Sequence, residues 1–330
     1  MRRFVIAFTV LAACANPALA YLKFGVSVQG RQVTLKWSET PVRYAVTTTS
    51  VPGVSAADFQ GAVQRAFDTW QAVPTSAIAY QFTGITSAIP GRDDGVSTLG
   101  FANRPDLDRV LAATSFVIDM STGALIESDV FFNSAFAWSV APSGESNRFD
   151  LQSIALHEIG HLSGLAHSAL GETEPREGGS RRVLASEAVM FPIAFTPGSI
   201  AGRTLKADDI AGVSDLYPDG GFTQARGSVS GRVTKDGMPL FGAHVIAFNP
   251  STGAMIAGFT LNAQGQFSIN GLSPGPHVIR VEPLDDADIE SFFSASRTVD
   301  IDFRAAFADR IAIVPPGGDS GSVELKVVPK

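Results

Sequence analysis

The chain has 330 residues, of which 45% are hydrophobic and 17% charged, and its formal net charge is −7. A length of this order suggests two domains. The acidic balance argues against nucleic acid or an anionic membrane surface as the main partner, and a single cysteine excludes a fold that is held by internal disulfides.

Residues 1–20 have the layout of a secretory signal peptide. Two arginines precede an apolar run, and Ala-Leu-Ala at 18–20 is the expected cleavage site. The rival interpretation is that Leu-Ala-Ala-Cys at 11–14 resembles a lipobox, which would place a lipid on Cys14 and anchor the protein at the membrane surface. The first route predicts a secreted protein, extracellular or periplasmic. The apolar run is too short for a transmembrane helix, and no later segment is long and apolar enough for one.

The next part of the chain predicts a helix followed by a sheet. Ser55 and Asp58 form a capping pattern, and apolar residues then recur at helical spacing as far as Trp70. Ser-Thr-Gly at 121–123 predicts a hairpin between two strands. The expected strands are 78–82, 96–101, 110–118 and 124–132.

Residues 157–167 read HEIGHLSGLAH, which fits the zinc-protease pattern H-E-x-x-H-x-x-G-x-x-H. His157 and His161 are four residues apart, so on a helix both can face one ion. Gly164 allows the chain to turn, because glycine tolerates positive φ at a helix end. That turn brings His167 around as a third nitrogen ligand. Three protein ligands leave one position open for water, which is typical of a catalytic zinc.

Glu158 lies beside the expected ion without taking a ligand position, where a general base for the metal-bound water is needed. Asp150 is the expected N-cap of this helix, and its charge favours the positive end of the helix dipole. We therefore expect a helix over about 151–163. The charged and glycine-rich residues 172–182 that follow are expected to form a mobile loop near the rim of the site, or a tolerated surface insertion.

Four stretches of this half resemble matrixins, the matrix-metalloproteinase family of metzincins, here in a bacterial form. The stretches are 150–156 before the zinc helix, His167-Ser168, the sequence VMFP at 189–192, and LKADDIAGV at 205–213. The resemblance covers roughly residues 34–218. It implies an α+β fold in which a metzincin catalytic domain combines a twisted mixed sheet with three helices.

The resemblance also assigns roles around the zinc. Met190 would form the methionine turn below the ion, and the segment after Pro192 would form a wall of the specificity pocket. An extended protein or peptide substrate would lie along a sheet edge within 110–119, by strand addition. The implied activity is that of a zinc endopeptidase.

The chain departs from the family in two ways. The five histidines include none before the zinc helix, so a second, structural zinc is not expected in its usual form and one catalytic zinc is predicted. The only cysteine lies in the leader, so the family's cysteine latency switch is not expected either. Calcium remains a second candidate metal, because carboxylate oxygens suit it. Its candidate ligands are Asp93, Asp94, Asp106, Asp108, Asp119 and Asp129.

From Gly227 onward the pattern changes to short strands separated by glycine-containing turns, which indicates an all-β sandwich. The expected strands are 229–233, 243–248, 255–260, 266–269 and 277–281. Stretches at 231–234, 239–245 and 265–275 resemble the carboxypeptidase regulatory-like domain, a transthyretin-like sandwich, over about 227–283. His244 and His277 fall on these strands and are expected to be structural. The predicted division is leader 1–20, protease domain 21–218, linker 219–226 and sandwich domain 227–330.

Three functions are compatible with these patterns. The first is a secreted zinc endopeptidase with Glu158 as general base. The second is a cell-surface or extracellular binding or adhesion module whose protease domain is inactive or highly restricted. The third is a processing protease with a single natural substrate. The complete motif favours an enzyme, because a degenerate domain would often lose Glu158.

Overall fold

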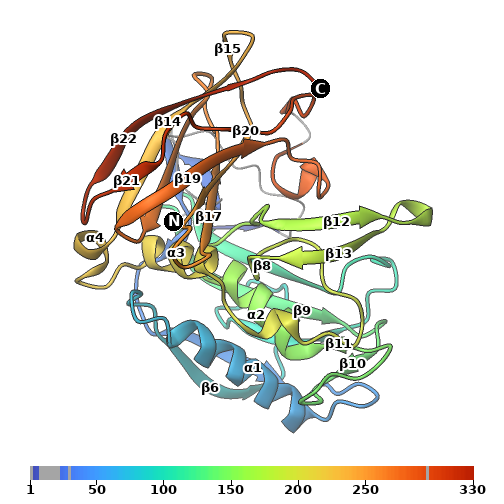
Figure 1. Ribbon diagram of the computed structural model, residues 1–330. Coiled ribbons are helices and arrows are strands. Elements are labelled where there is room, and N and C mark those ends of the chain that lie inside the picture. The colour runs from blue at the N-terminus through green and yellow to red at the C-terminus, as the bar shows by residue number, and fades with distance from the viewer. Residues whose placement is uncertain (1–2, 7–22, 29–30, 295–296) are drawn as a thin grey trace.

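A computed structural model describes residues 3–6, 23–28, 31–294 and 297–330 (Figure 1). The first half is an α+β unit, and the second half is a β-sandwich that lies above it in the view of Figure 1. Cys14 and the predicted cleavage site at 18–20 lie outside the described residues. No helix in the described ranges has the length and apolar character needed to cross a bilayer.

The first half contains a seven-stranded mixed sheet in the order β1-β8-β9-β7-β5-β6, with β4 paired to β9. β5, β6, β7 and β9 run parallel, and β8 joins β9 as an antiparallel hairpin. The hairpin turns at Gly123, whose φ of 77° confirms the predicted turn. The strands are β1 (Arg3–Ile6), β4 (Lys36–Trp37), β5 (Val42–Thr47), β6 (Tyr80–Thr86), β7 (Thr98–Ala102), β8 (Ala112–Asp119) and β9 (Ala124–Asn133).

Helices α1 (Ala56–Gln71) and α2 (Leu151–Leu162) pack together against this sheet. α1 begins at the predicted capping box, and its apolar face is buried through to Trp70. α2 begins at Asp150, whose side chain accepts the N–H of Ser153 at 2.9 Å. The indole N–H of Trp70 donates to the carbonyl of Leu156 at 2.8 Å, which fixes α1 against α2.

Short elements connect these parts. They are β2 (Gly25–Val28), β3 (Arg31–Thr34), β10 (Trp138–Ser139), β11 (Phe149–Asp150), η2 (Ala201–Arg203), α3 (Ala207–Leu216) and α4 (Phe222–Ala225). The stretch 205–213, which resembles matrixins, contributes to α3, and α4 falls within the predicted linker 219–226.

Residues 172–182 do not form the irregular loop that was expected, and a surface insertion stays compatible with the structure. The segment forms an antiparallel hairpin of β12 (Gly171–Pro175) and β13 (Arg181–Ser186), with η1 (Glu177–Gly179) at its tip. The hairpin extends between the sheet and the sandwich in Figure 1. Its backbone is held from outside, because the N–H of Thr173 donates to Asp286 at 2.7 Å. A hydrogen bond to a residue more than a hundred positions away therefore holds one strand of this hairpin.

The sandwich has two sheets, and all five predicted strands are present with shifted ends. One sheet contains β14 (Gly227–Lys235), β15 (Met238–Pro239), β18 (Gln266–Leu272) and β22 (Asp319–Val327). The other contains β16 (His244–Phe248), β17 (Met255–Phe259), β19 (Gly275–Glu282), β20 (Ala306–Phe307) and β21 (Ala312–Val314). The C-terminal strand β22 pairs in parallel with β14 and so belongs to the first sheet.

The two halves share buried contacts. One apolar cluster combines Val183 and Phe191 from the first half with Phe259 and Phe293 from the second. The carboxylate of Asp208 on α3 also accepts the N–H of Ala257 on β17 at 2.9 Å. Asp208 is only 2% exposed, so a charge there lies at the boundary between the halves without contact to water.

This buried carboxyl predicts a pH-dependent stability. Burial, opposed by the Ala257 N–H and reinforced by the neighbouring Asp209, raises the pKa of Asp208 to about 7. Because the folded pKa lies above the unfolded one, the contribution to stability is complete below about pH 4. It is lost as the pH rises through about 7. Asp208→Asn should remove this loss, so its Tm should rise relative to wild type between pH 5 and pH 8.

The measurement is thermal unfolding of both proteins over that pH range. The expected shift is about 2–4 °C for each kcal/mol that the buried charge costs. Asp300→Asn is the control. Lys235 lowers the pKa of Asp300, so the Tm of this variant should not rise above that of wild type between pH 5 and pH 8. Parallel curves of Tm against pH for Asp208→Asn and wild type would contradict the prediction.

Candidate metal centre

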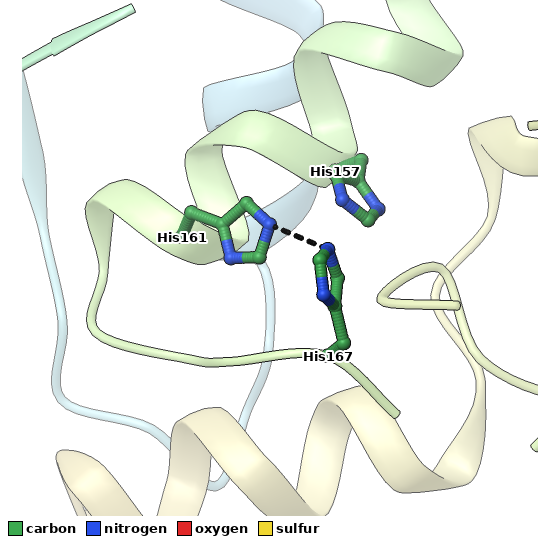
Figure 2. Close-up of side chains that lie close together, drawn as sticks. All are labelled: His157, His161 and His167. Carbon is green, nitrogen blue, oxygen red and sulfur yellow. Dashed lines mark hydrogen bonds between the residues drawn. The ribbon is translucent and has the colours of Figure 1, made fainter. Parts of the chain in front are cut away.

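Three histidines meet at the C-terminal end of α2. His157 and His161 lie one turn apart on the helix, and His167 returns from the chain beyond it (Figure 2). The turn is made at Gly164, whose φ is 100° and where an added Cβ would lie 2.5 Å from the carbonyl oxygen of Leu35. Glycine is therefore required both for the conformation and for the close approach.

The ligand atoms of these histidines all lie within 4.8 Å of one another. In the part of the chain that the structure describes, they form the only such group of three or more His, Cys, Asp or Glu side chains. The Nε2 atoms of His161 and His167 are 3.2 Å apart, and a dashed line joins the two rings in Figure 2. Two ligand nitrogens of a tetrahedral zinc would be separated by about 3.3 Å, given Zn–N bonds of about 2.0–2.1 Å.

The other ring nitrogen of each histidine faces a backbone carbonyl. Nδ1 of His157 lies 2.8 Å from Val189 O, and Nδ1 of His161 lies 2.8 Å from Leu165 O. Nδ1 of His167 lies 2.7 Å from Ser291 O. Since a carbonyl oxygen only accepts, Nδ1 must carry the hydrogen in each ring, which leaves the lone pair on Nε2. This tautomer is the one that a metal held through Nε2 requires.

Burial keeps the three rings uncharged. It lowers the pKa of His157, and it lowers the pKa of His161 well below its usual value, with the other two rings adding to the shift. The pKa of His167 falls to about 3, chiefly through burial and then through His157. Neutral imidazole is the form that binds a metal, so the side chains fit a zinc ion.

Glu158 lies on α2 between the first two histidines and is 5% exposed. Its Oε2 accepts the hydroxyl of Thr114 on β8 at 2.6 Å. Burial raises the pKa of Glu158 to about 7, and the bond from Thr114 opposes that rise. Sequence reasoning placed a strand over Thr114 but missed its contact, because nothing in a strand pattern says which residue faces the helix.

Met190 packs against α2 at Gly160, and its role in a methionine turn below the ion stays a prediction. It is 2% exposed, and a Cβ added to Gly160 would lie 2.3 Å from its sulfur. The carboxylate of Asp209 on α3 accepts the N–H groups of Val189 at 2.8 Å and Met190 at 3.1 Å. Asp209 thus holds the turn whose Val189 carbonyl orients His157. Sequence reasoning missed this role of Asp209.

Pro192 follows the buried Phe191 and is itself half-buried, two residues beyond Met190. The structure thus places it next to the methionine turn, and its role in a specificity pocket stays a prediction.

In this structure the side of β8 that faces away from β9 is occupied in part by β1, whose residues 3–6 lie within the predicted leader 1–20. The backbone of β1 pairs antiparallel with residues 116–119 of this strand. Thr114, the partner of Glu158, belongs to the same strand. Thr114, within the range 110–119 predicted as the substrate edge, therefore contacts Glu158, and substrate binding along this strand stays a prediction.

The aspartates considered as calcium ligands mostly have other partners. Asp129 is buried and accepts the N–H groups of Gly91 and Thr98 at 2.6 and 2.7 Å. Asp106 pairs with Arg104. Within the described ranges these aspartates form no metal group of the kind seen for the histidines, and calcium stays a prediction.

The two histidines of the sandwich are separate from this group. Nδ1 of His244 lies 3.0 Å from Glu282, and Nδ1 of His277 lies 3.2 Å from the carbonyl of Gly275. Both rings are buried on sandwich strands, as expected for structural residues.

Comparison with known proteins gives two family matches. Residues 36–173 match the family described as Matrixin, and residues 228–304 match the Carboxypeptidase regulatory-like domain.

Matrix metalloproteinase-2 of Drosophila melanogaster is 27% identical over 214 residues, which cover 61% of this chain and 24% of that protein. Matrix metalloproteinase-20 of Homo sapiens is 27% identical over 191 residues, with coverages of 55% and 32%. Metalloendoproteinase 4-MMP of Arabidopsis thaliana is 28% identical over 169 residues, with coverages of 50% and 42%. The chain thus spans less than half the length of each of these relatives.

Proposed function

We propose that this chain, whose two halves match the Matrixin family over residues 36–173 and the Carboxypeptidase regulatory-like domain over residues 228–304, is a zinc-dependent endopeptidase acting on protein or peptide substrates. The observation that carries the proposal is the convergence of three histidine rings, whose ligand atoms lie within 4.8 Å of one another, from a helix that also carries the buried Glu158. His157, His161 and His167 would hold one zinc. When bound, the zinc would supply a Lewis acid for the scissile carbonyl and lower the pKa of a water molecule.

Glu158 is the general base of this mechanism. Its carboxylate takes a proton from the attacking water and then passes that proton to the leaving amine. The hydroxyl of Thr114 fixes the carboxylate from the side of β8. A substrate strand added to the edge of β8 would bring its peptide bond toward Glu158. Asp209 accepts the backbone N–H of Met190, and the Met190 side chain packs against α2, the helix that carries His157 and His161.

The cellular setting follows from the leader. We propose that residues 1–20 are removed and that the enzyme works outside the cytoplasm, with anchoring through Cys14 as the alternative. The proposed domain limits are 21–218 for the protease and 227–330 for the sandwich. Calcium would be an additional structural ion near Asp93, Asp94 or Asp129.

The test uses the purified chain from residue 21 onward. Its zinc content and its cleavage of casein and of a peptide library are measured before and after removal of the metal with a chelator. We expect one zinc per chain, cleavage that is lost with the metal and restored by zinc, and loss of zinc in His161→Asn. Cleavage of library peptides alone would indicate a narrow processing protease. Zinc-loaded protein that cleaves neither substrate would overturn the proposal and favour a binding module.

A further inference from the structure

A segment of the C-terminal half lies beside the three histidines. Residues 284–293, here called the docking segment, follow β19 and contain η3 (Ile289–Ser291). The carbonyl of Ser291 is the group that faces Nδ1 of His167 at 2.7 Å. The ring of Phe292 comes next, with its centroid 6.3 Å from that of His167.

The docking segment is anchored on the sandwich by two aromatic rings. Phe292 is 3% exposed and Phe293 is fully buried. Both pack on Phe259 of β17, at centroid distances of 5.7 and 5.4 Å. Aromatic pairs at these distances add to the free energy of burial. The position of Ser291 is therefore set by the apolar cluster that the two halves share.

The same segment is tied to the hairpin of β12 and β13. Asp286 accepts the backbone N–H of Thr173 through its side chain and the hydroxyl of Thr173 through its carbonyl, both at 2.7 Å. The guanidinium of Arg181 donates to the carbonyl of Asp285 at 2.6 Å. These bonds hold the docking segment against the half of the molecule that carries the histidines.

The three histidines differ in where their orienting carbonyls come from. Leu165 lies in the turn after α2, and Val189 lies in the turn of Met190, so both belong to the first half of the chain. Only His167 is oriented from the sandwich half. A carbonyl at Nδ1 fixes both the tautomer and the ring plane of a metal-binding histidine, and loss of such a partner costs about 10–100-fold in metal affinity.

We propose that the docking segment completes the zinc site, with the Ser291 carbonyl as a positioning group for His167. This inference rests on the proposed zinc site. The sandwich then has a role in the metal centre beyond any separate binding function. Displacing the segment would allow the His167 ring to change tautomer or rotate, which would turn Nε2 away from the ion.

The test compares Phe292→Ala with Phe303→Ala in the full chain. Both changes remove a buried phenylalanine, but Phe303 lies in the sandwich core and not beside His167. Zinc affinity is measured by competition with a chelator. The tautomer of His167 is read in the metal-free protein from long-range ¹H–¹⁵N correlations of the ring, a signature that a loss of stability alone would not change.

We expect Phe292→Ala to bind zinc about 10–100-fold more weakly and to lose the pure Nδ1–H signature at His167. Phe303→Ala should keep that signature and a zinc affinity close to wild type. If Phe292→Ala does not fold, Asp286→Ala replaces it, with Asp300→Ala as the matched control, because Asp300 pairs with Lys235 within the sandwich half. Asp286→Ala should then lower the zinc affinity and weaken the Nδ1–H signal of His167, both by less than Phe292→Ala would.

A folded Phe292→Ala protein with wild-type zinc affinity and an unchanged His167 signal would overturn the inference alone. Wild-type protein that shows the Nδ1–H signal but binds no zinc would overturn the proposed function, and this inference with it. The two failures are therefore distinguishable.

Discussion

Glu158→Gln should leave the zinc bound and the fold intact while lowering peptide-bond cleavage by about 10²–10⁴-fold. The amide has the shape of the carboxyl group, and its oxygen can still accept the hydroxyl of Thr114. It cannot take a proton from the attacking water. Burial already favours the uncharged form of this side chain, so a neutral amide should not destabilise the protein.

The measurement is kcat/KM on a peptide selected from the library, together with the zinc content and Tm of each variant. Glu127→Gln is the matched control, because Glu127 is 1% exposed and burial raises its pKa to about 7 as well. It has no contact with the histidine group among the interactions described, so its activity should stay within a few-fold of wild type. A zinc-loaded Glu158→Gln enzyme with wild-type activity would remove Glu158 from the mechanism.

Gly160→Ala should destabilise the protein, although alanine is the better helix former by about 1 kcal/mol. A Cβ at this position would lie 2.3 Å from the sulfur of Met190 and 2.9 Å from the ring of Trp70. Both side chains are buried, and the Trp70 ring is held by its bond to Leu156. Overpacking of this kind costs about 1–3 kcal/mol. Displacement of Met190 should also disturb Val189, the partner of His157, and so weaken zinc binding.

Gly61→Ala on α1 is the control for this prediction. The Cβ there meets only the end of the flexible Arg65 side chain, at 3.3 Å. That variant should gain about 0.5–1 kcal/mol, because it lacks the clash and reduces the freedom of the unfolded chain. Urea unfolding of the metal-free and zinc-loaded proteins measures both changes. Equal gains in stability at the two positions would show that Met190 does not pack against α2 as described.

Local patterns predicted much of the protein. The capping residues Ser55 and Asp150 set the starts of α1 and α2, because a cap bonds only to backbone groups a few residues away. Alternating strands and glycine turns placed the sandwich strands with small errors at their ends. The hairpin at 171–186 was missed, since its charged and glycine-rich sequence has no strand pattern and its partner lies at Asp286. The C-terminal strand β22 was missed too, and it pairs with β14, the first strand of the second half, within one sheet.

The sequence by itself determined the histidine group of the site. His157, Glu158, His161 and His167 lie within eleven residues, and helix periodicity with one glycine turn is enough to bring the three rings together. Only the tertiary structure decided what holds them. Thr114, Asp209 and Ser291 contact the site from strand β8, a later helix and the sandwich. Ser291 acts through a carbonyl that every residue possesses, so no side-chain pattern could mark it, and only the packing of the two halves places that carbonyl beside His167.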